Sequence, residues 1–197
     1  MKNTETKNKI IRETKALLQK KRNVTIKDIA DKCFMNIASV NYYFGSKEFL
    51  IHQVVSEVID ELKASILQIL NDYKGQTKAV VLEAMIGFTY NYALENIGML
   101  SYLFLSQDMQ QNSGNLLVDT FFSDNEFTKL IFEEITLSNQ EIDHQTLYAQ
   151  YMILFSSFCM PLFISISNKG NSKQLETFKD EHFRSVFIKE LLRVIEA

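Results

Sequence analysis

The sequence contains very few of the residues that interrupt helices. Its 197 residues include one Pro and six Gly, and no Trp. Pro and Gly are the strongest helix breakers, so their scarcity permits long uninterrupted helices. Runs of β-branched and aromatic residues separated by turn signals are also missing, which argues against a sandwich or a barrel. We therefore predict an all-α protein, long enough for one or two domains with a real core.

Cysteine is almost as scarce. Cys33 and Cys159 are the only two, and each falls within an apolar helical pattern without the spacing of metal ligands. We expect two buried free thiols in a reducing compartment, with a redox switch as the less favoured alternative. The amino-terminal residues are polar and do not form a signal peptide, so a cytoplasmic location is expected.

The residue patterns of catalytic sites are not found either. His52, His144 and His182 are widely separated, and neither paired metal-binding histidines nor a nucleophile elbow, a phosphate-binding Gly loop or paired catalytic carboxylates stand out. Asp143 next to His144 is interpreted as a helix cap or a solvated pair. We therefore expect no enzymatic activity, no metal and no cofactor.

Charge is divided unevenly along the chain. Residues 1–50 contain 11 Lys and Arg against 5 Asp and Glu, a balance of +6, whereas residues 51–197 carry −9. A basic amino-terminal module on an acidic body suits a polyanionic partner at one end only.

The stretch from Thr25 to Phe44 has the pattern of a helix-turn-helix. Thr25 and Asp28 form a capping box at the start of the first helix, and the chain is expected to turn near Phe34. Spacing by three and four residues predicts the inward faces of the two helices. These faces consist of Ile26, Ile29, Ala30 and Cys33 in the first helix, and Ile37, Val40 and Phe44 in the second.

The opposite face of the second helix is small, polar and uncharged. Such side chains can reach base edges in the major groove, whereas a solvated surface helix usually carries Lys and Glu. The candidates for base or sugar-phosphate contacts are Asn36, Ser39, Asn41 and Tyr42, beside Ala38. Thr25, Tyr43 and Lys47 are candidates for clamping the DNA backbone. Lys47 follows the Ser46 cap, where the helix dipole disfavours a cation unless a phosphate compensates; a solvated Lys is the alternative interpretation.

At these residues the chain becomes recognisable. The block Thr25–Leu50 resembles the DNA-binding domain of TetR-family transcriptional regulators, through Thr25, Asp28-Ile29-Ala30, Ser39 to Phe44 and Gly45-Ser46-Lys47-Glu48. One position departs from that pattern, because Phe34 stands in the turn where the family usually has Gly. The resemblance implies a helix-turn-helix domain at 1–46, followed at 47–197 by a helical domain for ligand binding and dimerisation, with about nine helices in all.

Apolar periodicity and turn signals divide the rest of the chain into helices. We predict a first helix at about 4–20 and a long helix at about 47–73 that ends at Gly75 and connects the two domains. Breaks rich in Asn, Ser and Gly then separate further helices at about 77–95, 98–109, 115–136, 140–167 and 172–195.

Residues 145–168 contain no Asp, Glu, Lys or Arg. The segment is about long enough to cross a bilayer, so a transmembrane helix is an alternative. Pro161, the polar residues that dilute the stretch and the absence of a flanking basic cluster argue against it. A helix that is apolar nearly all round is buried on two sides. The resemblance implies that this helix and the last one, at about 140–167 and 172–195, form a homodimer, as a palindromic operator would also require.

Aromatic and Met side chains are frequent in the body, and most of them are expected to form its core. The resemblance implies an inducer pocket among them. From Ala79 to Asn168 the only Lys or Arg is Lys129, so a ligand that is lipophilic and neutral or cationic is expected. The pocket candidates are Met85, Phe88, Tyr92, Phe104, Phe121, Phe122, Tyr151 and Phe155.

These features together predict a ligand-responsive transcriptional regulator. We expect a repressor that binds a palindromic operator in double-stranded DNA as a homodimer and is released by its inducer. Two alternatives remain: a helical small-molecule-binding protein that no longer reads DNA, and a DNA-binding activator without a ligand.

Overall fold

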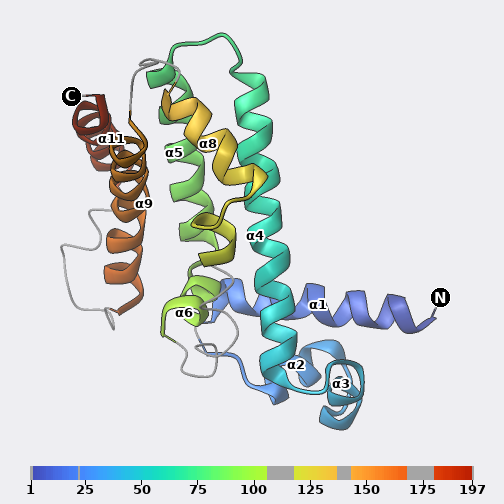
Figure 1. Ribbon diagram of the computed structural model, residues 1–197. Coiled ribbons are helices and arrows are strands. Elements are labelled where there is room, and N and C mark those ends of the chain that lie inside the picture. The colour runs from blue at the N-terminus through green and yellow to red at the C-terminus, as the bar shows by residue number, and fades with distance from the viewer. Residues whose placement is uncertain (1, 22, 106–117, 137–142, 168–179, 197) are drawn as a thin grey trace. The chain divides into compact units, whose positions relative to one another are not determined.

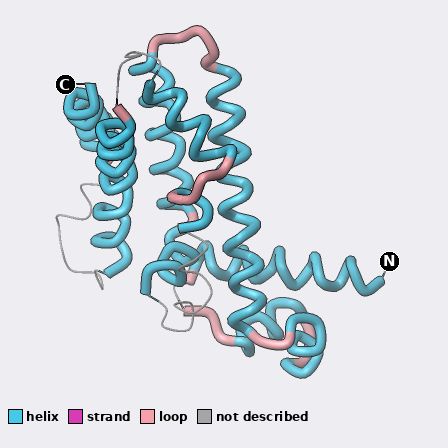
Figure 2. Tube along the Cα trace, in the orientation of Figure 1, coloured by secondary structure: helices cyan, strands magenta, loops and turns pink. Residues whose placement is uncertain are grey.

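A computed structural model describes residues 2–21, 23–105, 118–136, 143–167 and 180–196. Over these residues the chain forms α-helices joined by turns, without any strand (Figures 1 and 2). The prediction of an all-α protein is therefore confirmed. The helices are α1 (Lys2–Lys20), α2 (Ile26–Cys33), α3 (Ile37–Phe44), α4 (Lys47–Asp72), α5 (Lys78–Glu95), α6 (Ile97–Leu105), α8 (Glu126–Thr136), α9 (His144–Ser167) and α11 (Glu181–Glu196).

The chain divides into two compact units. The first comprises Met1–Glu61 and Glu95–Val118, and the second comprises Leu62–Leu94 and Asp119–Ala197. The first unit therefore contains α6 and the beginning of α4 in addition to α1–α3. These units do not coincide with the domains at 1–46 and 47–197 that the sequence predicts. The boundary between a DNA-binding domain and a ligand-binding domain therefore stays a prediction.

The first unit has a closely packed aliphatic core. In it α1 packs against α2 and α6, and α2 packs against α3. The side chains that are fully removed from solvent come from every helix and from the α1–α2 connection; they include Ile10, Leu18, Val24, Ile29, Val40, Leu50, Val54 and Met99. This core fixes α3, whose own eight residues are too few to form a stable isolated helix.

The second unit has its own core, formed by α5, α8, α9, α11 and the later part of α4. In it α9 packs against both α8 and α11. Its buried residues include Ile66, Leu82, Ile86, Ile131, Leu154, Ile188 and Leu191. Pro161 lies inside α9 and is buried, and the helix continues through it.

The expected helix boundaries hold for α1, α4 and α5 to within about two residues. The single helix expected at 115–136 is wrong, since the chain breaks at residues 122–125 before α8 begins. Asn125 makes this break: its Oδ1 accepts a hydrogen bond from the Thr128 amide at 3.0 Å, which caps α8. The parts of the expected helices that fall at 106–117, 137–142 and 168–179 lie outside the described residues.

Helix α9 is the most apolar long helix of the described chain. Among the described residues it provides one segment, His144–Ile164, that by length and composition alone is able to cross a membrane, and 29% of the tested window is buried. The sequence predicts that this helix is buried on two sides. Within a single chain, α9 is buried on one side only. Its outward face carries large apolar side chains, namely Tyr148, Met152, Ile153, Met160, Phe163 and Ile164.

Candidate nucleic-acid interface and ligand-binding core

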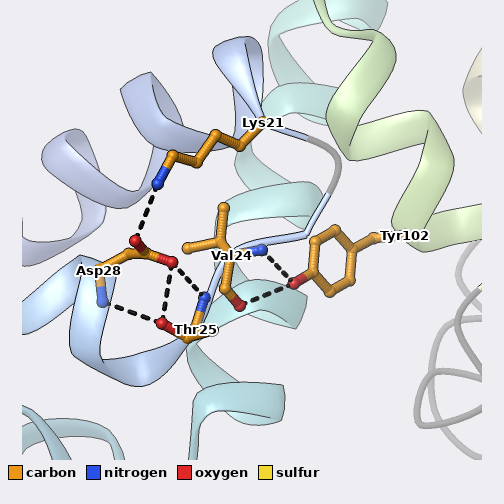
Figure 3. Close-up of polar contacts among 5 residues, drawn as sticks. All are labelled: Lys21, Val24, Thr25, Asp28 and Tyr102. Carbon is orange, nitrogen blue, oxygen red and sulfur yellow. Dashed lines mark hydrogen bonds and ion pairs between the residues drawn. The ribbon is translucent and has the colours of Figure 1, made fainter.

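The start of α2 forms the predicted capping box. The Thr25 hydroxyl accepts a hydrogen bond from the Asp28 amide at 3.1 Å, and Asp28 Oδ2 accepts one from the Thr25 amide at 2.9 Å. Asp28 Oδ1 also accepts from Lys21 Nζ at 2.8 Å (Figure 3). The Lys21 ammonium and the two groups of Thr25 hold the pKa of this carboxyl well below its usual range. One carboxylate therefore ties the end of α1 to the start of α2.

The turn between α2 and α3 is made by Phe34 in the left-handed conformation, with φ 57° and ψ 44°. Its amide donates to the Asp31 carbonyl at 3.1 Å, and the Met35 amide donates to the Ala30 carbonyl at 2.9 Å. These are the two hydrogen bonds of a Schellman motif, which Gly usually completes. The Phe34 side chain is 91% exposed, and Lys9 Nζ lies 5.8 Å from its ring centroid. The chain thus makes the turn without Gly, at the energetic cost of a left-handed Phe.

Helix α3 begins at an Asn cap. The Asn36 Oδ1 atom accepts a hydrogen bond from the Ser39 amide at 2.7 Å, so part of its hydrogen-bonding capacity is used within the protein. Val40 and Phe44 are buried, as expected. Ile37 is 40% exposed, so the expectation that it points inward is wrong. At 100° per residue Ile37 lies about 20° from the buried Phe44 and about 40° from the exposed Asn41, so it stands at the edge of the outward face.

The remaining candidate residues on α3 differ in exposure. Asn41 is exposed and Tyr42 is 79% exposed, whereas Ser39 and Tyr43 are half-buried. The rings of Tyr42 and Tyr43 meet edge to face, with their centroids 5.3 Å apart. Asn41 and Tyr42 are therefore the most accessible of the predicted DNA contacts within α3. The assignment of all these residues to DNA stays a prediction.

The start of α4 carries the last candidate. Ser46 caps the helix, since its hydroxyl accepts a hydrogen bond from the Phe49 amide at 3.1 Å. Lys47 is partly buried and forms an ion pair with Glu48 at 3.4 Å. In the free protein Glu48 therefore provides the negative charge that Lys47 needs beside the helix dipole.

Helix α6 is joined to the helix-turn-helix by a buried tyrosine that the sequence did not single out. The Tyr102 hydroxyl accepts a hydrogen bond from the Val24 amide and donates one to the Val24 carbonyl, each at 3.0 Å (Figure 3). Near the start of α6, a Cβ on Gly98 would lie 1.8 Å from the Leu18 carbonyl oxygen, so only Gly allows this approach to α1. Next to it, Asn96 Oδ1 accepts a hydrogen bond from Gln19 Nε2 at 3.2 Å.

In the second unit the structure brings five of the eight pocket candidates together. Phe121, Phe122, Tyr151 and Phe155 form one set of ring contacts, the tightest between Phe122 and Phe155 with centroids 4.5 Å apart. The Tyr151 hydroxyl donates to the Phe121 carbonyl, and burial raises its pKa. Met85 is buried in the same core.

Two further pocket candidates, Phe88 and Tyr92, stack on one another on α5 with centroids 5.7 Å apart. The side chain of Phe104 lies outside the described residues. The ring contacts of the main set fit the expectation that most body aromatics form core.

A cation also reaches the interior of this unit. The Arg184 side chain on α11 is 14% exposed, and its guanidinium carbon lies 6.0 Å from the centroid of the Tyr90 ring. Burial raises the pKa of the Tyr90 hydroxyl. Arg184 lies beyond the segment Ala79–Asn168, in which the sequence shows almost no cations, so charge counting along the chain missed it.

The two cysteines are free thiols, Cys33 buried and Cys159 partly buried. Burial raises the pKa of Cys33, and it raises that of Cys159 to about 11. A thiol with a raised pKa is a poor nucleophile at neutral pH, because the reactive form is the thiolate.

Within the described residues, the fold is all-helical and comprises two units, of which the first contains a capped helix-turn-helix. No family model matches the sequence and no curated protein matches it. Solved structures do match. A protein described as a tetR family transcription regulator from Shewanella sp. PV-4 has a TM-score of 0.62 at 14% identity, covering 96% of this chain and 97% of its own. RolR in complex with its ligand resorcinol has a TM-score of 0.59 at 15% identity, covering 98% and 88%.

The chain therefore has the fold of TetR-family transcription regulators, and the resemblance noted in the sequence is confirmed at the level of the fold. The match extends over nearly the whole chain, well beyond the block Thr25–Leu50 on which the resemblance rested.

Proposed function

We propose that the protein is a ligand-responsive transcriptional regulator, without enzymatic activity, that acts in the cytoplasm as a homodimeric repressor of a palindromic operator. The observation that carries this proposal is the outward face of α3, which is exposed and uncharged and presents Asn41 and Tyr42 within a TetR-type fold. Short hydrogen-bonding side chains on such a face can reach base edges in the major groove.

The homodimer is supported by the outward face of α9. Large apolar side chains lie exposed along the helix, and Val186 and Val194 of α11, which packs against α9, are exposed as well. An exposed apolar helix face of this kind favours an interface, and a second copy of the chain would cover it. The two-fold axis would place two copies of α3 for reading successive major grooves. A membrane helix is the alternative, and the polar residues within α9 and the regulator fold count against it.

The ligand is proposed to be lipophilic and to bind among the aromatic residues of the second unit. RolR, which has the same fold, is seen with resorcinol, a small neutral aromatic compound. Arg184 adds to the argument from charge: its guanidinium is largely buried near Tyr90, and its ion-pair partner Glu181, 3.8 Å away, is exposed, so the positive charge inside disfavours a cationic ligand at that position. Of the neutral and cationic classes expected from the sequence, the neutral one is therefore better supported.

Helices α4 and α6 are proposed to carry the response. Helix α4 contains residues of both units, and α6 belongs to the first unit and follows α5 of the second directly along the chain. Tyr102 of α6 is bonded to Val24 in the α1–α2 connection, and Gly98 allows α6 to approach the end of α1. A ligand that prefers another position of these helices would change the spacing of the two α3 helices and release DNA. Nearly complete release requires that the ligand bind the released form about 10⁴-fold more tightly.

A gel-shift titration against the DNA upstream of the protein's own gene tests the proposal. We expect binding that weakens steeply with salt, as phosphate contacts require. The Tyr42→Ala variant should lose about tenfold or more in affinity, and Tyr73→Ala, an exposed Tyr outside the helix-turn-helix, should bind as the wild type does. Equal binding by both variants would show that α3 does not read DNA through this face.

The same titration, together with thermal unfolding in the presence of neutral aromatic compounds, distinguishes the two alternative functions. A small-molecule-binding protein that no longer reads DNA would bind weakly and without sequence preference, yet would be stabilised thermally by neutral aromatic compounds. An activator without a ligand would bind DNA specifically and show no such stabilisation. The proposed repressor requires both DNA binding and its loss on addition of a stabilising compound.

A further inference from the structure

The outward face of α3 contains an apolar half that the sequence pattern concealed. Ile37, Ala38, Asn41 and Tyr42 are exposed, at positions i, i+1, i+4 and i+5, whereas Val40 and Phe44 are buried. At 100° per residue Ile37 lies at the edge of the exposed face, about 20° from Phe44 and about 40° from Asn41. An Ile that is 40% exposed in the first turn of a helix contributes less to the core than a buried one, which leaves it available for an apolar contact outside the protein.

The polar half of the face is smaller than the sequence suggests. The Asn36 amide oxygen is occupied as the cap of α3. Within the described part of the chain, the Asn41 side-chain amide makes no hydrogen bond, so both its donor and its acceptor are available. Asn41 therefore has the only fully available side-chain amide on α3.

The charge of α3 restricts which bases it can read. All eight of its residues, Ile37–Phe44, are described, and none is Lys, Arg, Asp or Glu. Guanine is read mainly by Arg or Lys on O6 and N7, and cytosine is read by carboxylates. Adenine is read by a bidentate Asn or Gln, and the thymine methyl is read by apolar side chains. The side chains exposed on α3 match the second pair of bases.

We propose, on the basis of the DNA-binding function proposed above, that α3 reads A·T base pairs at the centre of each operator half-site. Asn41 pairs with an adenine through N6 and N7, and Ile37 packs against the 5-methyl group of a thymine. The two residues are four apart, which separates them by about 6 Å along the helix axis, so their targets lie within about two base pairs of each other. Ile37 and Asn41 are thus the residues that determine specificity.

The experiment has two stages and uses the full-length protein. Selection from a randomised duplex identifies the preferred site, which we expect to contain adjacent A·T pairs at the centre of each half-site. That site is then prepared with uracil in place of each thymine, which removes only the methyl group. Wild-type affinity should fall about three- to fivefold at one position, the effect of one buried methyl.

Variants assign the effect to the two residues. In Ile37→Ala the uracil substitution should no longer matter, whereas Leu67→Ala, an exposed apolar residue of α4 outside the helix-turn-helix, should keep the wild-type sensitivity. Asn41→Ala should lower the preference for adenine over guanine by about 5- to 100-fold. Thermal unfolding of each variant checks that α3 is still folded.

The possible failures are distinguishable. A selected half-site centred on G·C pairs would overturn the inference and leave the DNA-binding function standing. A uracil effect that persists in Ile37→Ala would overturn the role of Ile37. No enrichment of any sequence over non-specific binding would overturn the proposed function, and this inference with it.

Discussion

The Tyr102 hydroxyl satisfies both backbone groups of Val24 at once, accepting from its amide and donating to its carbonyl at 3.0 Å each. Val24 immediately precedes the Thr25 cap of α2, and its side chain is buried. A residue 78 positions further along the chain therefore provides the hydrogen bonds that the short connection between α1 and α2 cannot make internally. This contact fixes where the helix-turn-helix begins.

Replacing Tyr102 by Phe should destabilise the first unit. The change removes the hydroxyl and leaves two backbone groups of Val24 without their partner, at a cost of about 1–3 kcal/mol. Denaturant unfolding measures this loss, and Tyr73→Phe, which alters an exposed ring, is the matched control. A Tyr102→Phe protein as stable as the control would mean that water or another group replaces the hydroxyl.

Replacing Gly98 by Ala should also be destabilising, for a steric reason. The added Cβ would lie 1.8 Å from the Leu18 carbonyl oxygen and 2.7 Å from that of Lys21, both of them backbone atoms. We expect a loss of roughly 2–3 kcal/mol as α6 moves away from α1.

Gly87→Ala is the matched control for that change, because nothing lies within 4 Å of its Cβ position on α5. It should stabilise the protein by about 0.5–1 kcal/mol through helix propensity. If both Ala variants gained stability, the close approach of α6 to α1 would be absent in solution.

Replacing Phe34 by Gly should stabilise the protein. Gly adopts φ 57° without the penalty of about 1–2 kcal/mol for a left-handed residue with a Cβ. The loss of the Lys9 contact with the Phe34 ring offsets part of this gain, so a net increase of about 1 kcal/mol is expected. Phe34→Ala keeps the penalty and removes the ring, and should be neutral or slightly destabilising. The reverse order of the two variants would indicate that the ring matters more than the turn.

Ionisation of Asp28 should make the free energy of unfolding depend on pH under acidic conditions. Its pKa is lowered in the folded protein by Lys21 and by Thr25, so its contribution is fully present above its ordinary pKa of 3.8. That contribution is lost as the pH falls toward the lower folded value. The stability difference between wild type and Asp28→Asn should therefore be larger at pH 7 than at about pH 2.5. Asp31→Asn, an exposed carboxylate of the same helix, serves as the control.

Replacing Met160 by Lys should produce monomers. Met160 is 61% exposed on the apolar face of α9, and burying a charge in the proposed interface without a partner is strongly unfavourable. Sedimentation measures the oligomeric state, and operator affinity should fall with it. Val80→Lys, which introduces the same charge at an exposed apolar position of α5, should leave the dimer intact. A wild-type protein that sediments as a monomer would contradict the proposed assembly itself.

Much of the fold could be predicted from local sequence signals. The capping box of Thr25 and Asp28, the Ser46 cap and the periodic apolar residues of α4 act within one or two helical turns, so their pattern is visible in the sequence. The break before α8 was missed because Asn125 caps a helix within an otherwise helical pattern. Its effect depends on the amide of Thr128 and on competing helix propensity, which simple periodicity does not weigh.

The candidate site was predicted less completely. The choice of Asn41 and Tyr42 as outward residues agrees with their exposure, whereas Ile37 was placed in the core because spacing alone assigns every apolar residue to one face. The first turn of a helix lies at the edge of the core, and only the packing of the neighbouring helices decides whether a side chain there is covered.

The sequence by itself determined the all-helical fold class of the protein. Few helix breakers, a capped helix pair with an uncharged outer face and a basic amino-terminal quarter are local or compositional properties, and from them the sequence predicts the helix-turn-helix and its partner. Only the tertiary structure decided that Tyr102 holds Val24, that Gly98 admits α6 against α1, and that Arg184 reaches the interior beside Tyr90. Each of these contacts joins residues that are many positions apart, and they become neighbours only when the packing of the helices brings them together.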